Sequence, residues 1–363
     1  MFGPDDHAHM RRALALAERG LWTTTPNPRV GCVIVRDERV VGEGWHRRAG
    51  EPHAEALALA QAGSAARGAT VYVTLEPCSH FGRTSPCADA LVEAGVARVI
   101  AAMEDPNPQV AGRGLQRLRD AGIDVRCGLL AAEAAELNVG FVSRMMRGRP
   151  WVRMKVAASL DGRTALSSGE SQWITGEAAR ADGHLWRARA CAILTGIGTV
   201  REDDPRLTVR GVDTPRQPLR VLVDSRLEVD LDAQLLREGA LVFTAADNLP
   251  KEAEMRDRGC EVVRMPDPHG KVDLPGLLVE LAARGVNELH VEAGFALNGS
   301  LLREGCVDEL LVYLAPALIG EGRGSFALGP FAALDEAPRW NFEDVERVGA
   351  DLRLRLRHPS PSR

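Results

Sequence analysis

Two cysteines and a histidine lie close together in the stretch VTLEPCSHFGRTSPCADAL, which runs from position 73 to position 91. They are Cys78, His80 and Cys87. Thiolates and imidazoles are the usual zinc ligands in proteins. A lone cysteine, however, is most often a small buried apolar residue, and a lone histidine is most often an ordinary surface or core residue. The stretch therefore indicates a metal site, and the residue types alone leave open which of the three side chains bind the metal.

A second segment, HAE at positions 53 to 55, precedes this stretch, with one expected strand between them. Together with Pro77-Cys78 it resembles the H-x-E…P-C-x-x-C signature of zinc deaminases. One histidine and two cysteines supply three ligands and leave the fourth tetrahedral position for water, as a catalytic zinc requires. His53 and Glu55 are two positions apart and point to different sides of a helix, so Glu55 is better suited to carry protons than to bind metal.

This sequence departs from the general signature, because eight residues rather than two separate Cys78 from Cys87. With that insert, and with TTTPNPRVGCVIV (23–35) and EDPNPQVAGRG (104–114), about the first 145 residues resemble the deaminase domain of the bifunctional riboflavin-biosynthesis deaminase/reductase family. The resemblance implies that zinc is bound by His53, Cys78 and Cys87. It also implies that Glu55 shuttles protons and Asn27 holds the pyrimidine ring, and it leaves His80 off the metal.

The insert and its neighbouring loops also supply candidates for binding the phosphoribosyl part of the substrate. His80 and Arg83 lie in the insert, and His46 and Asn107 lie on neighbouring loops. An arginine suits a phosphate because its guanidinium presents a fork of donors. For each of the four, a solvated loop residue is the alternative.

Glycines in the second half of the chain suggest a nucleotide site of another kind. GIGTV (196–200) begins like a dinucleotide-binding fingerprint, but the third glycine would fall at Arg201, so a Rossmann-type site is not supported. TGIGTV and VEAGFALNGS (291–300) nevertheless place glycines at the ends of expected strands, where a helix N-terminus could receive a phosphate. Ordinary strand-to-helix turns are the alternative.

Four segments resemble the reductase domain of the same family, which has a dihydrofolate-reductase-like fold and uses NADPH. The segments are KVAASLDGRTA (155–165), SGESQWIT (168–175), LTGIGTVREDDPRLTVR (194–210) and HVEAGFALNGSLL (290–302). The resemblance places these residues on the cofactor positions: Ala157, Trp173, Thr199, Asp203, Gly294, Phe295, Ala296, Leu297, Asn298, Gly299 and Ser300. It places these on or near the ribosyl-phosphate positions: Lys155, Ser171, Thr175, Arg187, Leu207, Arg210 and Glu292.

Charged residues of this set suit the reduction of a ribose. Arg187 and Arg210 could clamp a 5′-phosphate. Lys155, Asp203 and Glu292 could hold or protonate the sugar while its ring opens. The resemblance places these residues in the site but does not assign a role to each.

The pattern of elements indicates two α/β domains. In the first half we expect helices at 7–19, from His53 onward, and at 88–95, 114–122 and 131–146, a hairpin at 30–46, and strands at 70–75 and 98–103. In the second half we expect strands beginning at Trp151 and at 191–196, 219–225, 240–245, 260–265 and 288–294, then a strand-rich part from 308 to 359. Alternating strands and helices imply parallel sheets covered by helices.

We therefore expect a cytidine-deaminase-like α/β/α domain at residues 1–146, acting as a zinc-dependent pyrimidine deaminase. A dihydrofolate-reductase-like α/β domain at 147–363 would act as an NADPH-dependent reductase, with the boundary at RGRP (147–150). A length of 363 residues agrees with two domains. The expected reactions remove the 2-amino group of 2,5-diamino-6-ribosylamino-4(3H)-pyrimidinone 5′-phosphate and then reduce its ribose to a ribityl chain.

Composition restricts partners and location. The net charge is −5, without a long run of lysine and arginine, so a small phosphoribosyl pyrimidine is expected as partner rather than a long nucleic acid. No apolar run is long enough to span a bilayer. Seven cysteines, an odd number, and an N-terminus without the apolar stretch of a signal peptide indicate the reducing cytoplasm. We also expect a homo-oligomer.

Two other classes of protein carry some of these features. The first is a nucleic-acid-editing deaminase with an appended domain, and the second is a non-enzymatic, zinc-stabilised binding protein with a degenerate reductase. The acidic balance and the eight-residue insert argue against the editor. Glu55 beside an open zinc position argues against an inactive site.

Two substitutions test the ligand assignment. We expect His80→Ala to retain stoichiometric zinc and Cys87→Ser to lose zinc or bind it weakly, because only Cys87 completes the three-ligand set. Metal analysis of the purified variants measures this. Loss of zinc from the His80 variant would reverse the assignment.

Overall fold

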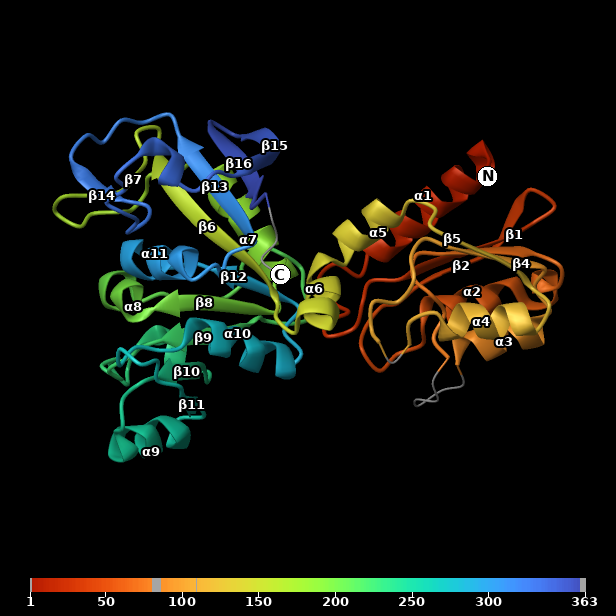
Figure 1. The fold of residues 1–363 in the computed structure, drawn as a ribbon, viewed down its shortest axis with the longest axis horizontal. Coiled ribbons are helices and arrows are strands. Elements are labelled where there is room, and N and C mark those ends of the chain that lie inside the picture. Colours follow the sequence, from red (N-terminus) through yellow and green to blue (C-terminus); the bar gives the residue numbers. More distant parts are fainter. Residues whose placement is uncertain (1, 80–85, 109, 360–363) are drawn as a thin grey trace. The chain divides into compact units, whose positions relative to one another are not determined.

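The structure is a computed structural model that describes residues 2–79, 86–108 and 110–359. It separates into two compact units, Met1–Gly148 and Arg149–Arg363 (Figure 1). Within the described ranges, none of the helices combines the length and the apolar character needed to cross a membrane.

A mixed sheet of five strands forms the centre of the first unit, in the order β2-β1-β3-β4-β5. The strands are β1 (Gly31–Arg36), β2 (Arg39–Trp45), β3 (Thr70–Val73), β4 (Arg98–Ala101) and β5 (Asp124–Cys127). β1 is antiparallel to both β2 and β3, whereas β3, β4 and β5 are parallel. The carboxyl ends of the three parallel strands therefore lie at one edge of this sheet.

Helices cover both faces of this sheet (Figure 1). They are α1 (Pro4–Glu18), α2 (Ala54–Ala62), α3 (Cys87–Ala94), α4 (Arg113–Asp120), α5 (Ala131–Leu137) and α6 (Val139–Arg147). Because strand residues alternate between faces, Cys32 and Ile34 pack with α2, α3 and α4, while Val33 and Val35 pack with α1 and α5. The expected α/β/α layering of this unit is confirmed.

A buried asparagine interrupts the helix that was expected at 131–146. Asn138 lies between α5 and α6 with φ −109° and ψ 22°. Its Oδ1 accepts the backbone N–H of Arg29 at 2.7 Å, and its Nδ2 donates to the Arg29 carbonyl at 2.9 Å. The prediction of one continuous helix was wrong, because this tertiary contact cannot be read from helical periodicity.

Two glycines of β2 bring α2 unusually close to the sheet. A Cβ atom at Gly42 would lie 2.2 Å from the Ala58 carbonyl oxygen, and one at Gly44 would lie 2.3 Å from that of Ala54. Only glycine allows this approach. It fixes the start of α2, where the HAE segment lies.

The second unit contains a nine-stranded sheet in the order β11-β10-β9-β8-β12-β6-β13-β16-β15. Its strands are β6 (Trp151–Ser159), β8 (Ala192–Gly196), β9 (Leu219–Val223), β10 (Leu241–Thr244), β11 (Glu261–Arg264), β12 (Glu288–Val291), β13 (Glu309–Ala315), β15 (Asn341–Val348) and β16 (Asp351–Arg357). The first seven strands of the order run parallel, and the last two pair in antiparallel fashion. A small antiparallel sheet pairs β7 (Arg163–Leu166) with β14 (Gly322–Gly324).

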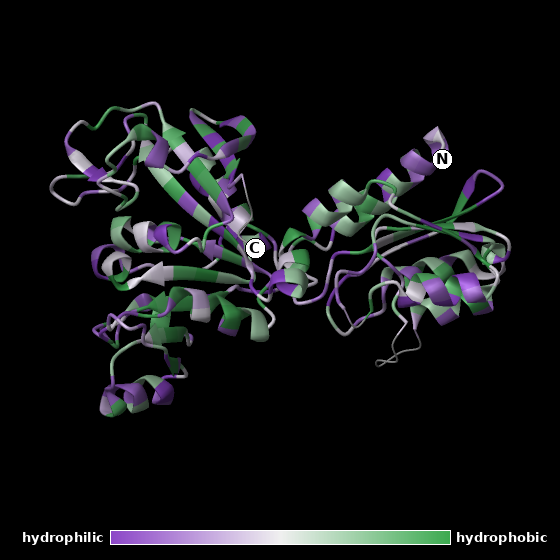
Figure 2. Ribbon diagram, in the orientation of Figure 1, coloured by the Kyte–Doolittle hydropathy of each residue, from purple (hydrophilic) through white to green (hydrophobic). Residues whose placement is uncertain are grey.

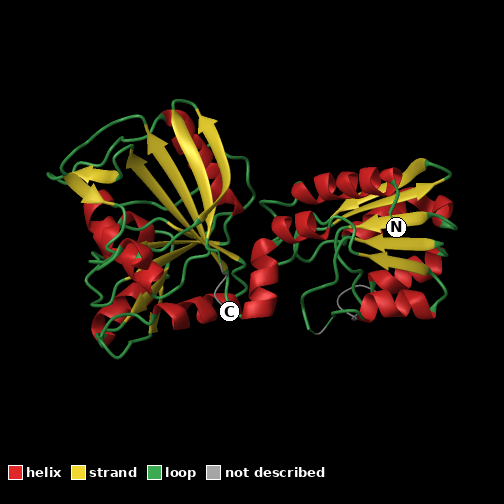
Figure 3. Ribbon diagram, turned by 45° about the horizontal axis from the view of Figure 1, so that its top comes forward, coloured by secondary structure: helices red, strands yellow, loops and turns green. Residues whose placement is uncertain are grey.

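Helices again lie against the large sheet (Figure 3). They are α7 (Glu177–Arg189), α8 (Ile197–Asp203), α9 (Leu249–Asp257), α10 (Leu274–Ala283) and α11 (Phe295–Arg303). Hydrophobic positions concentrate along the central strands, as in a parallel sheet buried on both faces (Figure 2). The expected strands of this half are present, each within a few residues of its predicted bounds.

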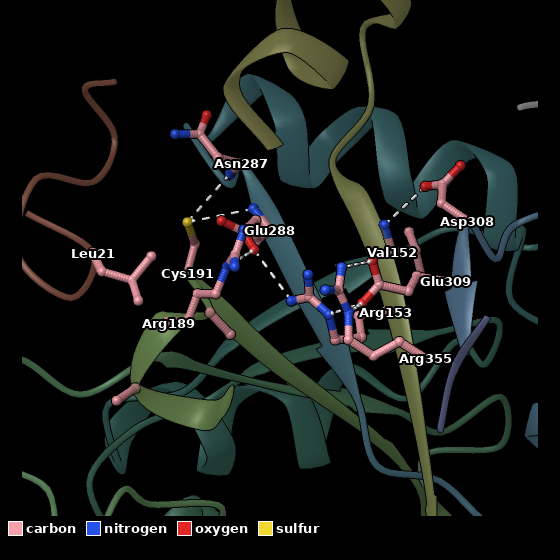
Figure 4. Close-up of polar contacts among 12 residues, drawn as sticks. Leu21, Val152, Arg153, Arg189, Cys191, Asn287, Glu288, Asp308, Glu309 and Arg355 are labelled. Atoms are coloured by element: carbon pink, nitrogen blue, oxygen red, sulfur yellow. Dashed lines mark hydrogen bonds and ion pairs between the residues drawn. The ribbon is translucent and has the colours of Figure 1, made fainter. Parts of the chain in front are cut away.

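A buried ion-pair cluster joins the amino-terminal parts of β6, β12 and β13. Arg153 donates through Nε to Glu309 at 2.6 Å and through Nη1 to Glu288 at 3.1 Å (Figure 4). All three side chains are at most 1% exposed. Burial opposes ionisation of Glu309, but the neighbouring Arg153 and Arg355 outweigh it and lower its pKa to about 2. This carboxylate therefore contributes stability above its ordinary pKa of 4.5, and the contribution is lost as the pH falls towards 2.

The cluster yields a stability prediction. Arg153→Met should destabilise the protein by on the order of 3 kcal/mol, because two buried carboxylates lose a cation while keeping their desolvation cost. Urea unfolding followed by tryptophan fluorescence measures this, since the Arg153 guanidinium lies 4.5 Å from the Trp186 ring. The exposed Arg237→Met serves as control. Equal unfolding curves for the two variants would contradict the structural role of the cluster.

Candidate active sites

Three side chains of the first unit converge on one point, and each is placed by the end of an element. His53 caps the start of α2, Cys78 follows β3, and Cys87 is the first residue of α3. His53 Nδ1 lies 3.6 Å from Cys78 Sγ and 3.3 Å from Cys87 Sγ. Zinc–nitrogen and zinc–sulfur bonds at a tetrahedral angle separate two ligand atoms by about 3.6 Å. The donor set and its spacing therefore fit zinc.

The two thiols of this site differ in acidity. Cys78 Sγ accepts a hydrogen bond from the Cys87 side chain and another from the backbone N–H of Cys87, at 3.3 Å. These bonds and the nearby His53 imidazole lower the pKa of Cys78 despite its burial. One thiolate is therefore prepared for a metal before any metal binds.

Glu55 lies in the first turn of α2 beside this cluster and is only 3% exposed. Burial raises its pKa to about 7, while His53 acts in the opposite direction. Among the described residues, histidine, cysteine, aspartate and glutamate side chains gather into a possible metal site only at His53, Cys78 and Cys87. Glu55 is thus next to the site without belonging to the ligand group.

His46 lies against His53 and is hydrogen-bonded to Asn27. Asn27 Nδ2 is 3.0 Å from His46 Nε2, and His46 Nδ1 is 3.2 Å from the Pro52 carbonyl oxygen. A carbonyl only accepts, so His46 carries its proton on Nδ1, and its Nε2 accepts from the Asn27 amide. The His46 and His53 rings meet edge to face at 5.3 Å. Of the predicted substrate residues, His46 therefore contacts the candidate metal cluster directly, and Asn27 is joined to it through His46.

Other predicted residues of this unit have different positions. His80 and Arg83 lie outside the described residues. Asn107 lies in the loop after β4, where its backbone N–H donates to Asp105 Oδ1 at 2.8 Å. The assignment of these three residues to the substrate stays a prediction.

Sequence reasoning missed Glu76, which immediately precedes the Pro77-Cys78 pair. Its carboxylate is 3% exposed and accepts four backbone N–H groups at 2.7 to 3.2 Å. These come from Asp105, Gly112, Gly114 and Leu115. A Cβ at Gly114 would lie 1.9 Å from the Pro77 carbonyl oxygen. The glycine-rich run AGRG at 111–114 could have indicated this close packing.

A second candidate site is a cavity of about 380 Å³ in the other unit. Predicted residues that line it are Lys155, Ala157, Ser171, Trp173, Thr175, Arg187, Thr199, Asp203, Leu207, Glu292, Gly294, Phe295 and Asn298. Gly299 and Arg210 are not among the lining residues. Lining residues that were not predicted include Arg180, Glu202 and Arg323. Arg180 and Glu202 lie near predicted residues in the chain, and Arg323 lies on β14. None of the three belongs to a motif that the sequence analysis used.

The charged groups of this cavity are organised around Glu292. Arg187 binds it with both arms of its fork, Nε to Oε1 at 2.5 Å and Nη2 to Oε2 at 2.7 Å. Burial alone would raise the pKa of Glu292, but Arg187 and the nearby Lys155 hold it well below its usual value. Burial also lowers the pKa of Lys155. The site thus holds a carboxylate that ionises more readily than usual next to a lysine that releases its proton more readily than usual.

Arg210 is linked to the same region through the backbone. Its N–H donates to His184 Nδ1 at 3.1 Å, and Arg187 Nη1 donates to the Thr208 carbonyl at 3.0 Å. Arg187 is engaged by Glu292, so the two-arginine phosphate clamp remains a prediction. These hydrogen bonds nonetheless connect α7, which carries Arg187 and His184, with the segment that carries Thr208 and Arg210.

The remaining predicted cofactor residues surround a wider groove of about 740 Å³, lined by Gly294–Leu297 and Ser300. Gly294 caps α11, so the first N–H groups of this helix face the groove and suit a phosphate. Asn298 Nδ2 donates to the Ala293 and Ser325 carbonyls, while its buried Oδ1 has no hydrogen-bond partner among the described residues. An unsatisfied buried acceptor and a helix N-terminus together fit a dinucleotide such as NADPH.

Comparison with known families finds a match for each of the two units. Residues 4–103 match the cytidine and deoxycytidylate deaminase zinc-binding region, and residues 150–354 match the RibD C-terminal domain. The riboflavin biosynthesis protein RibD of Escherichia coli K12 is 49% identical, over 97% of this chain and 99% of its own length. That of Aquifex aeolicus is 41% identical, over 96% and 97% respectively.

Solved structures give the same result. Acinetobacter baumannii RibD superposes with a TM-score of 0.91 at 45% identity, covering 98% of this chain and 99% of the other. A diaminohydroxyphosphoribosylaminopyrimidine deaminase/5-amino-6-(5-phosphoribosylamino)uracil reductase from Thermotoga maritima superposes with a TM-score of 0.87 at 32% identity, covering 98% and 99%. These matches confirm the expected pair of folds, a cytidine-deaminase-like unit and a dihydrofolate-reductase-like unit. The chain belongs to the RibD family of bifunctional, zinc- and NADPH-dependent riboflavin-biosynthesis enzymes.

Proposed function

We propose that residues 1–146 deaminate 2,5-diamino-6-ribosylamino-4(3H)-pyrimidinone 5′-phosphate and that residues 147–363 reduce the deaminated product to its ribityl form with NADPH. One observation carries this proposal: each unit contains a complete candidate site. His53, Cys78, Cys87 and Glu55 meet in the first unit, and the Lys155–Glu292 cavity opens beside the cofactor groove in the second.

In the deamination, zinc bound by His53, Cys78 and Cys87 supplies Lewis-acid activation of a water molecule. Glu55 accepts a proton from the attacking water and passes it to a ring nitrogen. The same carboxylate then takes the second proton, that of the added hydroxyl, and delivers it to the amino group, so the C–N bond breaks, the water oxygen stays as the carbonyl and the amine leaves as ammonia. Burial of Glu55 keeps bulk water from competing for these protons.

In the reduction, NADPH supplies the hydride for C1′ of the ribose. Lys155 is the better proton donor for the opened ring oxygen, because burial lowers its pKa whereas Arg187 keeps Glu292 ionised. Glu292 accordingly holds the sugar hydroxyls as an acceptor. Asp203, exposed at the cavity wall, and the other predicted residues bind the substrate or the cofactor.

We assign a positioning role to His46. Since its Nε2 holds the Asn27 Nδ2 group, Asn27 Oδ1 is the atom that faces the pyrimidine and accepts its N–H donors. His46 therefore acts through Asn27 rather than on the phosphoribosyl group.

A homo-oligomer in the cytoplasm completes the proposal. β15 is an edge strand whose Phe342 and Val345 are 64% and 56% exposed, which supports a partner surface there. No two of the seven cysteines, all within the described residues, are joined by a disulfide, which supports a reducing compartment.

Glu55→Gln tests the two-site assignment in the full chain. We expect it to keep zinc and lower deamination by at least about a hundredfold, since the amide preserves shape but carries no proton. NADPH oxidation with the already deaminated substrate should stay at the wild-type rate. Ammonia release, metal analysis and absorbance at the NADPH band measure the three quantities. If the folded, zinc-loaded variant lost NADPH oxidation, the separation into two sites would be refuted.

His46→Phe tests the positioning role. The ring still packs on His53, but Asn27 loses its anchor, so kcat/KM of deamination should fall about tenfold with zinc retained. A double variant with Asn27→Ala should be no worse than Asn27→Ala alone, because both changes remove one function. Additive losses would instead mean that His46 touches the substrate itself.

A further inference from the structure

His184 is a half-buried residue of α7 that the proposed reaction does not use. It lies between Arg180 and Arg187 on one face of the helix, because residues three and four positions apart are neighbours on a helix surface. Arg180 and Arg187 both line the cavity of Lys155 and Glu292. A titratable side chain therefore lies in line with two residues of the reductase cavity.

The segment from Leu207 to Arg210 runs along the same face of α7. Leu207 lines the cavity, and the next residue, Thr208, accepts Arg187 Nη1 through its carbonyl at 3.0 Å. The N–H of Arg210 then donates to His184 Nδ1 at 3.1 Å. Leu207 has a φ of 50°, which a leucine rarely adopts, so the surrounding contacts rather than local preference set the path of the segment. These contacts lead from the cavity to His184 and Arg210.

The bond to the Arg210 backbone determines which nitrogen of His184 carries the proton. A backbone N–H only donates, so Nδ1 accepts and has no proton of its own. Burial, with the cations Arg187 and Arg210 nearby, lowers the pKa of His184 to about 4, so the ring is neutral at neutral pH. The single proton is therefore on Nε2. The described residues provide no hydrogen-bond acceptor for this Nε2–H, which leaves it available to a ligand.

Positive charge exceeds negative charge around His184. The cations that lower its pKa are Arg187, Arg210 and Lys155, and Glu292 is the carboxylate that opposes them. Both oxygens of Glu292 are already bound by Arg187. The end of the segment near His184 therefore lacks a counterion of its own.

Arg210 shows the same excess of positive charge. Burial and the neighbouring Arg187 and Arg206 lower its pKa. Its guanidinium donates to Thr208 Oγ1 at 3.3 Å, and it forms no ion pair with a carboxylate in the part of the chain that the structure describes. A guanidinium and an imidazole N–H that share an uncompensated positive region suit a phosphate group.

We propose that His184 and Arg210 together bind the 5′-phosphate of the reductase substrate. His184 fixes the Arg210 backbone through Nδ1 and donates to a phosphate oxygen through Nε2–H. Arg187 stays with Glu292, so His184 takes the place of Arg187 in the expected clamp. This inference rests on the proposed reductase function and deepens it by naming the groups that recognise the phosphate.

Inhibition of NADPH oxidation by D-ribose 5-phosphate tests the pair in the full-length protein, because this assay reports on the reductase site alone. His184→Leu should raise the inhibition constant about tenfold or more, since it removes a hydrogen bond to a charged group and frees the Arg210 backbone. It should also lower, about tenfold, the preference for the deaminated substrate over its 5′-dephosphorylated form. The change should lie in KM, with kcat within about twofold of wild type.

Two further variants separate the two nitrogens of His184. In His184→Asn the amide oxygen can replace Nδ1 and keep the Arg210 backbone bond, whereas in His184→Gln the amide nitrogen can replace the Nε2–H donor. Each should lose less affinity for D-ribose 5-phosphate than His184→Leu. Leu185→Asn, a change at the neighbouring position of α7 that is 42% exposed, is the control and should leave the inhibition constant unchanged.

Two results would overturn the proposal. One is an unchanged inhibition constant in His184→Leu, and the other is an equal loss of kcat/KM for the phosphorylated and dephosphorylated substrates. Failure of the reductase function itself looks different, because the wild-type protein would then not oxidise NADPH with the deaminated substrate at all.

Discussion

The deaminase site depends on one buried carboxylate that takes no part in the chemistry. Glu76, at the end of β3 where the chain leads to Cys78, accepts four backbone N–H groups from the loop after β4 and from the first turn of α4. A buried carboxylate is tolerated only when its oxygens are satisfied, so the loop and the strand end must take this one arrangement together. The glycines of β2 impose the matching constraint on α2 and hence on His53 and Glu55. The candidate zinc-binding side chains of three separate elements therefore meet where these two constraints act.

In the reductase unit, ion pairs between arginine and glutamate side chains hold the elements around the site. Its sites also lie at the carboxyl ends of parallel strands, where β8, β9 and β12 release their loops. There Arg187 reaches from α7 to Glu292 and fixes it with two hydrogen bonds. At the opposite end of the same sheet, the Arg153 cluster connects the amino-terminal ends of β6, β12 and β13. The Arg153 ion pairs, at the amino-terminal ends of the strands, keep the strands in register. The Arg187–Glu292 pair, at the carboxyl ends, orients the groups proposed to meet the substrate.

The sequence was sufficient for the layering and for the grouping of His53, Cys78 and Cys87, because both rest on local patterns. The alternation of residue types along a strand shows which side chains face the core. The HAE and Pro-Cys segments each lie at the start or end of an element. It was insufficient wherever a single side chain reaches across the fold. Asn138 breaks a helix by binding Arg29, and Glu76 binds a loop some thirty residues away in the chain. Arg187 forms an ion pair with Glu292. These contacts join residues about 30 to 110 positions apart, and no periodic pattern records them.

Two glutamates show how neighbours divide the roles of one residue type. Glu55 is buried beside His53 and two thiols, with no ion pair to an arginine or lysine among the described residues, so its proton can move to and from a substrate. Glu292 is also shielded, but both its oxygens are bound by one guanidinium. Protonating Glu292 would break that pair, so it serves as a fixed negative charge. In the proposed reduction the proton then comes from a neighbour, and Lys155 suits this role because burial lowers its pKa.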